Sequence, residues 1–154
     1  MKIAWLLFLI FASFIGFAQS PICFRFGQLP QDSLEMIEAK FISAIDSRPD
    51  MPSAFPGGEE KVLQQWTTLH AEFQQHLKHF NVVFDADLKF FFRFYFQQDG
   101  SIAYVGYRII SPVSESFSSS FKNHLLEFSR HQQFGLTAHQ PFSQCGTVTY
   151  PKNQ

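Results

Sequence analysis

The feature that most limits how this chain can fold is one turn between two aromatic segments. Asp99-Gly100 is a two-residue turn signal of the type I′ kind, and residues 88–96 and 102–110 flank it. Both flanking segments are rich in aromatic and β-branched residues, which is typical of β-strands. The pattern predicts an antiparallel hairpin.

The predicted hairpin also has a definite register. If Asp99 and Gly100 form the turn, opposite residues have numbers that add up to 199. Because side chains alternate between the two faces of a strand, one face is expected to be apolar and the other mixed. The pairs on the apolar face are Phe96 with Ala103, Phe94 with Val105, Phe92 with Tyr107, and Phe90 with Ile109.

A long amphipathic helix is predicted before the hairpin. Pro56 lies just before its start, and Glu59 and Glu60 stand in its first turn, where the helix dipole favours anions. Apolar residues then recur at helical spacing, at Val62, Trp66, Leu69, Phe73, Leu77 and Phe80.

A second helix and a last strand are predicted after the hairpin. Ser111 is expected to cap the helix and Pro112 to open it, and the helix should end near His131. Its apolar positions are Phe117, Phe121, Leu125 and Phe128. Residues 134–142 are expected to form a loop, and residues 147–150 a short strand that Pro151 stops.

These elements predict an α+β domain of two layers. Two amphipathic helices would pack on a small three-stranded antiparallel sheet in the order α-β-β-α-β. A proline- and glycine-rich stretch at residues 48–58 predicts a boundary ahead of this domain. The expected divisions are a signal peptide at 1–18, an N-terminal extension with a short helix near 31–43 at 19–54, and the domain at 55–154.

The first residues have the pattern of a secretory signal peptide. Lys2 gives a positive start, residues 3–14 carry no charge, and Gly16 and Ala18 suit a cleavage site after Ala18. The expected location is the periplasm, with a mature chain starting at Gln19. An uncleaved inner-membrane anchor is the alternative, although residues 3–18 fall short of the roughly 20 apolar residues that span a bilayer.

Cys23 and Cys145 are the two cysteines of the chain. An oxidising compartment could join them and tie the N-terminal segment to the last strand. The alternative is two unpaired thiols.

The composition and the polar residues favour binding over catalysis. A net charge of -1 without a Lys/Arg tract argues against nucleic acid as a partner. His76 and His79 could share a helix face, but no further metal ligand stands at suitable spacing, and the adjacent Glu59 and Glu60 do not face each other. We therefore predict no enzyme, no metal and no cofactor.

Two motifs resemble the C-terminal domain of TonB-type energy transducers. The first is Phe55-Pro56-Gly57-Gly58-Glu59-Glu60, after residues 41–46. The second is the aromatic strand that ends at Phe96, followed by Asp99-Gly100-Ser101-Ile102 and Val105. The resemblance covers roughly residues 41–151. The chain departs from the family in lacking the long proline- and lysine-rich linker that spans the periplasm, which puts an energy-transducing role in doubt.

The resemblance implies a binding role at the last strand. Domains of this family recruit an extended segment of an outer-membrane receptor beside that strand, in the manner of β-strand addition. Carried over to this chain, the partner-binding residues are Thr147, Val148, Thr149 and Tyr150. The expected partner is an envelope protein or an extended peptide. The alternative is a structural envelope protein that uses the same edge to form a homodimer, or an edge capped by the chain itself.

Overall fold

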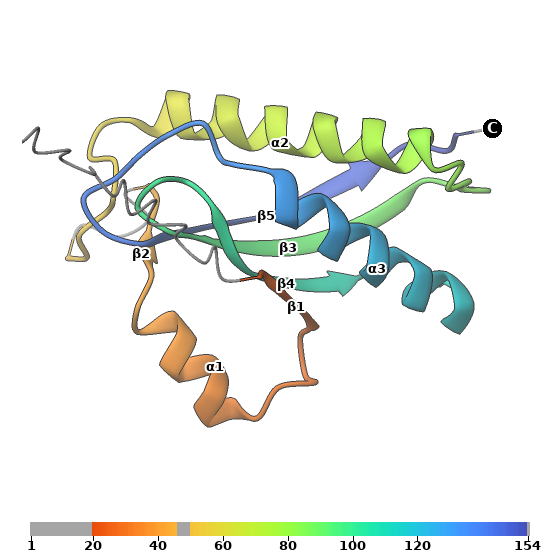
Figure 1. Cartoon of the computed structure of the whole chain (residues 1–154), viewed down its shortest axis with the longest axis horizontal. Helices are drawn as coiled ribbons and strands as arrows, with labels where there is room; N and C mark the ends of the chain where they lie inside the picture. The colour runs from red at the N-terminus through yellow and green to blue at the C-terminus, as the bar shows by residue number, and fades with distance from the viewer. Residues whose placement is uncertain (1–19, 46–49, 154) are drawn as a thin grey trace, which may run out of the picture.

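The computed structural model describes residues 20–45 and 50–153. In chain order the elements are β1 (Ile22–Arg25), α1 (Gln31–Glu38), β2 (Ile42–Ser43), α2 (Glu59–His79), β3 (Leu88–Phe96), β4 (Ile102–Ile109), α3 (Glu115–His131) and β5 (Phe142–Tyr150) (Figure 1). The predicted signal peptide at residues 1–18 lies outside the described residues. Within the described part of the chain, no helix has both the length and the apolar character needed to cross a bilayer.

The strands form one mixed sheet in the order β1-β4-β3-β5-β2. β3 pairs antiparallel with β4 and β5, whereas β1 lies parallel to β4 and β2 parallel to β5. The predicted three-stranded antiparallel sheet under two helices is therefore wrong, because the described residues form five strands of mixed direction and three helices. The predicted α-β-β-α-β order is found from α2 to β5, and its three strands form the middle of the sheet.

The two added strands come from residues 19–54, which the sequence predicts as an extension. β1 pairs Cys23 with Val105, and β2 pairs Ile42 with Phe142. Parallel partners need long connections, so no turn signal stands beside either strand. Both strands are also too short for a visible hydrophobic pattern.

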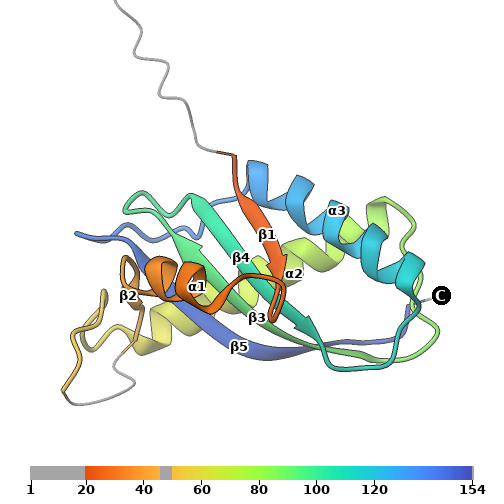
Figure 2. The same cartoon turned by 90° about the horizontal axis from the view of Figure 1, so that it is seen from below.

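The helices cover both faces of the sheet. α2 and α3 lie on one face, and α1 lies against the other (Figures 1 and 2). The predicted stripe of α2 is confirmed by the burial of Val62, Trp66, Leu69, Phe73 and Leu77. Its last member, Phe80, is 51% exposed because the helix ends one residue earlier.

The main core lies between the sheet and α2 and α3, and its largest side chains are mostly phenylalanines. The almost fully buried ones are Phe73, Phe90, Phe92, Phe94, Phe96, Phe121, Phe134 and Phe142. A smaller cluster on the other face contains Phe24, Phe41, Tyr95 and Ala103, with α1 packed on it. An ion pair between Arg93 of β3 and Glu38 also ties α1 to the sheet.

The hairpin of β3 and β4 is confirmed, with the predicted register over most of its length. The pairs from Phe90 with Ile109 to Tyr95 with Tyr104 keep the sum of 199. Nearer the turn the register shifts, and Phe96 pairs with Ile102 in place of Ala103. Ile102 consequently faces the main core, and Ala103 joins the cluster on the opposite face.

The turn explains this shift. The N–H of Gly100 donates to the carbonyl of Gln97 at 3.0 Å, and the N–H of Gln97 donates to the carbonyl of Ser101 at 2.8 Å. Gly100 has a φ of +83°, but Asp99 does not have the positive φ that a type I′ turn requires. The loop therefore has three residues, with glycine alone in the left-handed conformation, because a residue with a Cβ adopts it at a cost.

The second helix starts three residues later than predicted. Ser114 caps α3, and its hydroxyl accepts from the N–H of Phe117 at 3.1 Å. The hydroxyl of Ser111 instead accepts from the N–H of Lys89 at 2.9 Å and so fastens the end of the hairpin. The predicted end at His131 is confirmed.

Candidate functional site

β5 is paired along its whole length on one side and only at its start on the other. From Phe142 to Tyr150 every residue has a partner in β3, without a shift in register. On the outer side, β2 pairs with Phe142 and Ser143 alone. Among the described residues, no strand is paired with residues 144–150 on this outer edge.

The hydrogen bonds at the start of β5 establish which residues face outward. The carbonyl of Pro141 accepts from the N–H of Ile42 at 3.2 Å, and that of Ser143 accepts from the N–H of Ala44 at 2.8 Å. In a regular strand the N–H and C=O of one residue point to the same side, and successive residues alternate. The backbone groups of Cys145, Thr147 and Thr149 therefore point away from β3.

These three residues are also exposed in their side chains. One of the outward groups has a partner, since the side-chain amide of Gln144 donates to the carbonyl of Cys145 at 3.1 Å. For the backbone of Thr147 and Thr149, no outward bond to another described residue is found. The open edge, as we call residues 145–149 of β5, thus has unused donors and acceptors at every second residue.

The opposite edge of the sheet, at β1, is shorter and is partly closed. The N–H of Phe26 donates to the carbonyl of Tyr107, so even-numbered residues face β4 and Cys23 and Arg25 face outward. Gln28 satisfies both outward groups of Arg25: its side chain accepts from the N–H of Arg25 at 3.2 Å, and its own N–H donates to that residue's carbonyl at 3.0 Å. This edge therefore offers no continuous ladder.

Two contacts with α2 fasten β5 to the core. At Gly146 the indole of Trp66 packs so closely that a Cβ would lie 3.2 Å from its Nε1. At the end of the strand, the hydroxyl of Tyr150 lies 2.7 Å from Nδ1 of the buried His70. Burial lowers the pKa of His70 to about 3, so the ring is neutral at pH 7 and packs between the rings of the core.

Of the four residues predicted to bind a partner, two face outward and two face the rest of the sheet. Thr147 and Thr149 face outward on the open edge, whereas Val148 and Tyr150 face β3 with their backbone and the main core with their side chains. The sequence-based prediction omits Cys145, which belongs to the outward set. The polar positions at every second residue, Cys145, Thr147 and Thr149, are the signal that could have identified it.

The two cysteines are not brought together. Both are free; Cys23 is buried in β1 and Cys145 is exposed on β5. β4 and β3 lie between these strands, so at about 4.8 Å per strand the two are roughly 14 Å apart. A disulfide needs Cα atoms within about 7 Å. Burial raises the pKa of the Cys23 thiol to about 12.

The two histidines considered as metal ligands in the sequence differ in their surroundings. His76 lies at the contact of α2 with α3, with its ring 5.7 Å from that of His124, and His79 is exposed. Burial, followed by the charge of His124, lowers the pKa of His76. In the described ranges no group of three or more histidine, cysteine or acidic side chains is placed to hold a metal ion.

The chain matches no protein-family model, no curated protein and no solved structure. The resemblance to the TonB C-terminal domain therefore depends on the two sequence motifs alone.

Proposed function

We propose that this chain is a binding module of the cell envelope that recruits an extended segment of a partner protein by strand addition at the open edge of β5. The observation that carries the proposal is the outward row of backbone groups at Cys145, Thr147 and Thr149, which β2 leaves uncovered. The signal-peptide pattern supports the envelope location, and the family resemblance supports the choice of strand. The proposed role is binding, without catalysis or a cofactor.

The length of the edge limits what such binding can achieve. Five residues at about 3.4 Å each give a ladder of roughly 17 Å. Three N–H groups and two unused carbonyls, each contributing a net ~1 kcal/mol, would stabilise an added strand by about 5 kcal/mol before the entropy of ordering it is subtracted. The ladder alone thus gives weak binding, and side-chain contacts must supply both selectivity and most of the affinity.

Hydrogen exchange of single amides tests the proposal most directly. In the free protein the amides of Thr147 and Thr149 should exchange fast, because they point to solvent, while that of Val148 should be protected by β3. A partner that adds a strand should slow exchange at Thr147 and Thr149 and leave Val148 unchanged.

Two variants test whether the open edge captures a partner from an envelope extract. Thr147→Pro removes an outward donor and should abolish capture, whereas Thr147→Val keeps the backbone N–H and should preserve it. Equal capture by both variants would argue against strand addition. If the two amides become protected without a partner and the molecular mass doubles in ultracentrifugation, the edge joins two copies of the chain, which is the structural alternative.

A further inference from the structure

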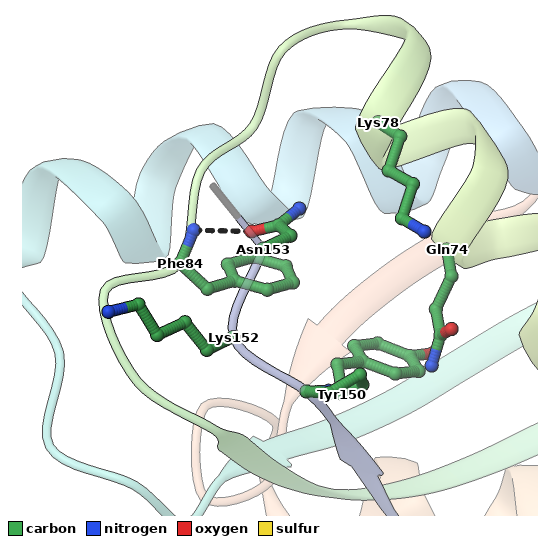
Figure 3. A pocket seen from close by; sticks show the side chains of 7 residues that line it. Gln74, Lys78, Phe84, Tyr150, Lys152 and Asn153 are labelled. Carbon is green, nitrogen blue, oxygen red and sulfur yellow. Dashed lines mark hydrogen bonds between the residues drawn. The ribbon is translucent and has the colours of Figure 1, made fainter.

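A small cavity lies where the open edge ends. Beyond Thr149 the ladder cannot continue, because Pro151 has no N–H. Beside this point is a cavity of about 50 Å³ between the last turns of α2 and the residues that follow β5. Figure 3 shows Gln74 and Lys78 reaching from α2 toward the ring of Tyr150, with Lys152 and Asn153 across from them.

The cavity has an aromatic floor and a positive rim. The rings of Phe84 and Tyr150 line it, and so do Lys78 and Lys152. Of the described residues in its lining, none is acidic. The volume has room for a few water molecules, or for one carboxylate group with its hydration.

Not every polar group of the lining is free to bind a ligand. Asn153 is committed, since its Oδ1 accepts from the N–H of Phe84 at 2.6 Å (dashed in Figure 3) and its Nδ2 donates to the carbonyl of Val82 at 3.0 Å. The backbone N–H of Lys152 donates to Asp87 at 2.8 Å, which holds the tail in place. The groups that remain for a ligand are the amine of Lys78 and the side-chain amide of Gln74, because the side chain of Lys152 runs away from them (Figure 3).

The direction of an added strand decides which of its ends meets the cavity. β2 occupies the same edge position just ahead of the open stretch, and it runs parallel to β5. A strand that continues in this direction brings its C-terminal end to the cavity. A strand of the opposite direction would bring its N-terminal end, where an α-ammonium group would be repelled by the amine of Lys78.

We propose that the partner segment is a free protein C-terminus that runs parallel to β5 and places its α-carboxylate at Lys78 and Gln74. The inference rests on the proposed strand addition and names the chemistry that the partner must supply. It also accounts for the added affinity that the short ladder needs, because a carboxylate with charged donors forms the stronger class of hydrogen bond.

Peptides with and without a terminal charge test this inference. The probes are two random octapeptide libraries, one displayed with free C-termini and one with free N-termini. Sequences selected from the first are synthesised as the acid and as the amide, and their affinities are measured by fluorescence anisotropy. Amidation should weaken binding about tenfold, because it removes the charge and one acceptor.

Variants of the lysines complete the experiment. Lys78→Gln should weaken the acid peptides by up to about fivefold, as expected for an exposed charge pair, and leave the amides unchanged. Lys61→Gln, on the same helix and roughly 25 Å away, should change neither. Thermal melting controls for the fold of each variant.

The outcomes separate the two proposals. If the peptides bind equally well as acids and as amides, and the Thr147→Pro variant no longer binds them, carboxylate capture is overturned and strand addition is retained. Binders from the free N-terminal library alone would do the same. If neither library yields a binder, both proposals fail.

Discussion

Proline substitutions at two neighbouring positions of β5 should have opposite consequences. The N–H of Val148 points to β3, where Val148 lies opposite Phe90, and that of Thr147 points to solvent. Proline removes the N–H and adds a ring in its place. In Val148→Pro the ring therefore points into the sheet, whereas in Thr147→Pro it points off its edge.

The magnitudes follow from the bonds that each variant loses. Val148→Pro deletes a ladder bond and leaves the buried carbonyl of Phe90 without its donor, which alone costs about 1–3 kcal/mol. The clash of the ring with β3 adds to this, so the total loss should be at least ~3 kcal/mol. Thr147→Pro breaks no bond within the protein and should stay within about 1 kcal/mol of the parent chain.

Urea unfolding followed by the fluorescence of Trp66 measures both variants, since this indole packs directly on Gly146 of β5. With a slope of about 1–3 kcal/mol per molar urea, the difference should separate the two midpoints by roughly 1 M. Equal destabilisation by the two prolines would refute the assignment of inward and outward residues, and with it the location of the open edge.

Three further predictions concern His70, Gly146 and the two thiols. The pKa of His70 falls from 6.5 in the unfolded chain to about 3 in the folded protein, so below pH 7 the unfolded state binds a proton that the folded state does not. The free energy of unfolding should therefore drop by about 2 kcal/mol from pH 7 to pH 5. In urea titrations at several pH values, His70→Phe should flatten this dependence on pH. Gly146→Val forces a side chain against Trp66 and should cost about 1–3 kcal/mol with a shift in indole emission, so an unchanged spectrum would contradict the close packing. Of the two thiols, Cys145 should react at once with a thiol reagent, and Cys23 should react only when the protein unfolds. If neither thiol reacts in the unfolded chain, the two cysteines form a disulfide, which would contradict the distance between their strands.

Local patterns account for the parts of the fold that the sequence predicts well. The apolar stripe of α2 needs only its own spacing, and the partners in the β3–β4 hairpin are separated by a short turn. The error within the hairpin is local too. The pair Asp99-Gly100 suits more than one turn, and the three-residue loop that forms here has glycine alone with a positive φ.

The errors of larger scale come from pairings between distant segments. β1 and β2 each join a strand more than 80 residues away, and neither has a pattern of its own because each is only two to four residues long. Their placement changes the candidate site as well. β1 becomes one edge of the sheet, and β2 covers the start of β5, so the proposed binding edge is restricted to residues 145–149.

The sequence by itself determined the α-β-β-α-β order from α2 to β5 and the buried stripe of α2 from Val62 to Leu77. Each of these depends on periodicity or on a turn, which are properties of neighbouring residues. Only the tertiary structure decided that Thr147 and Thr149 face outward while Val148 does not, and that a lysine-rimmed cavity lies at the end of the strand. The direction of a backbone N–H depends on which side of the strand its partner occupies, and α2 and the C-terminal tail meet at the cavity only after the chain has folded.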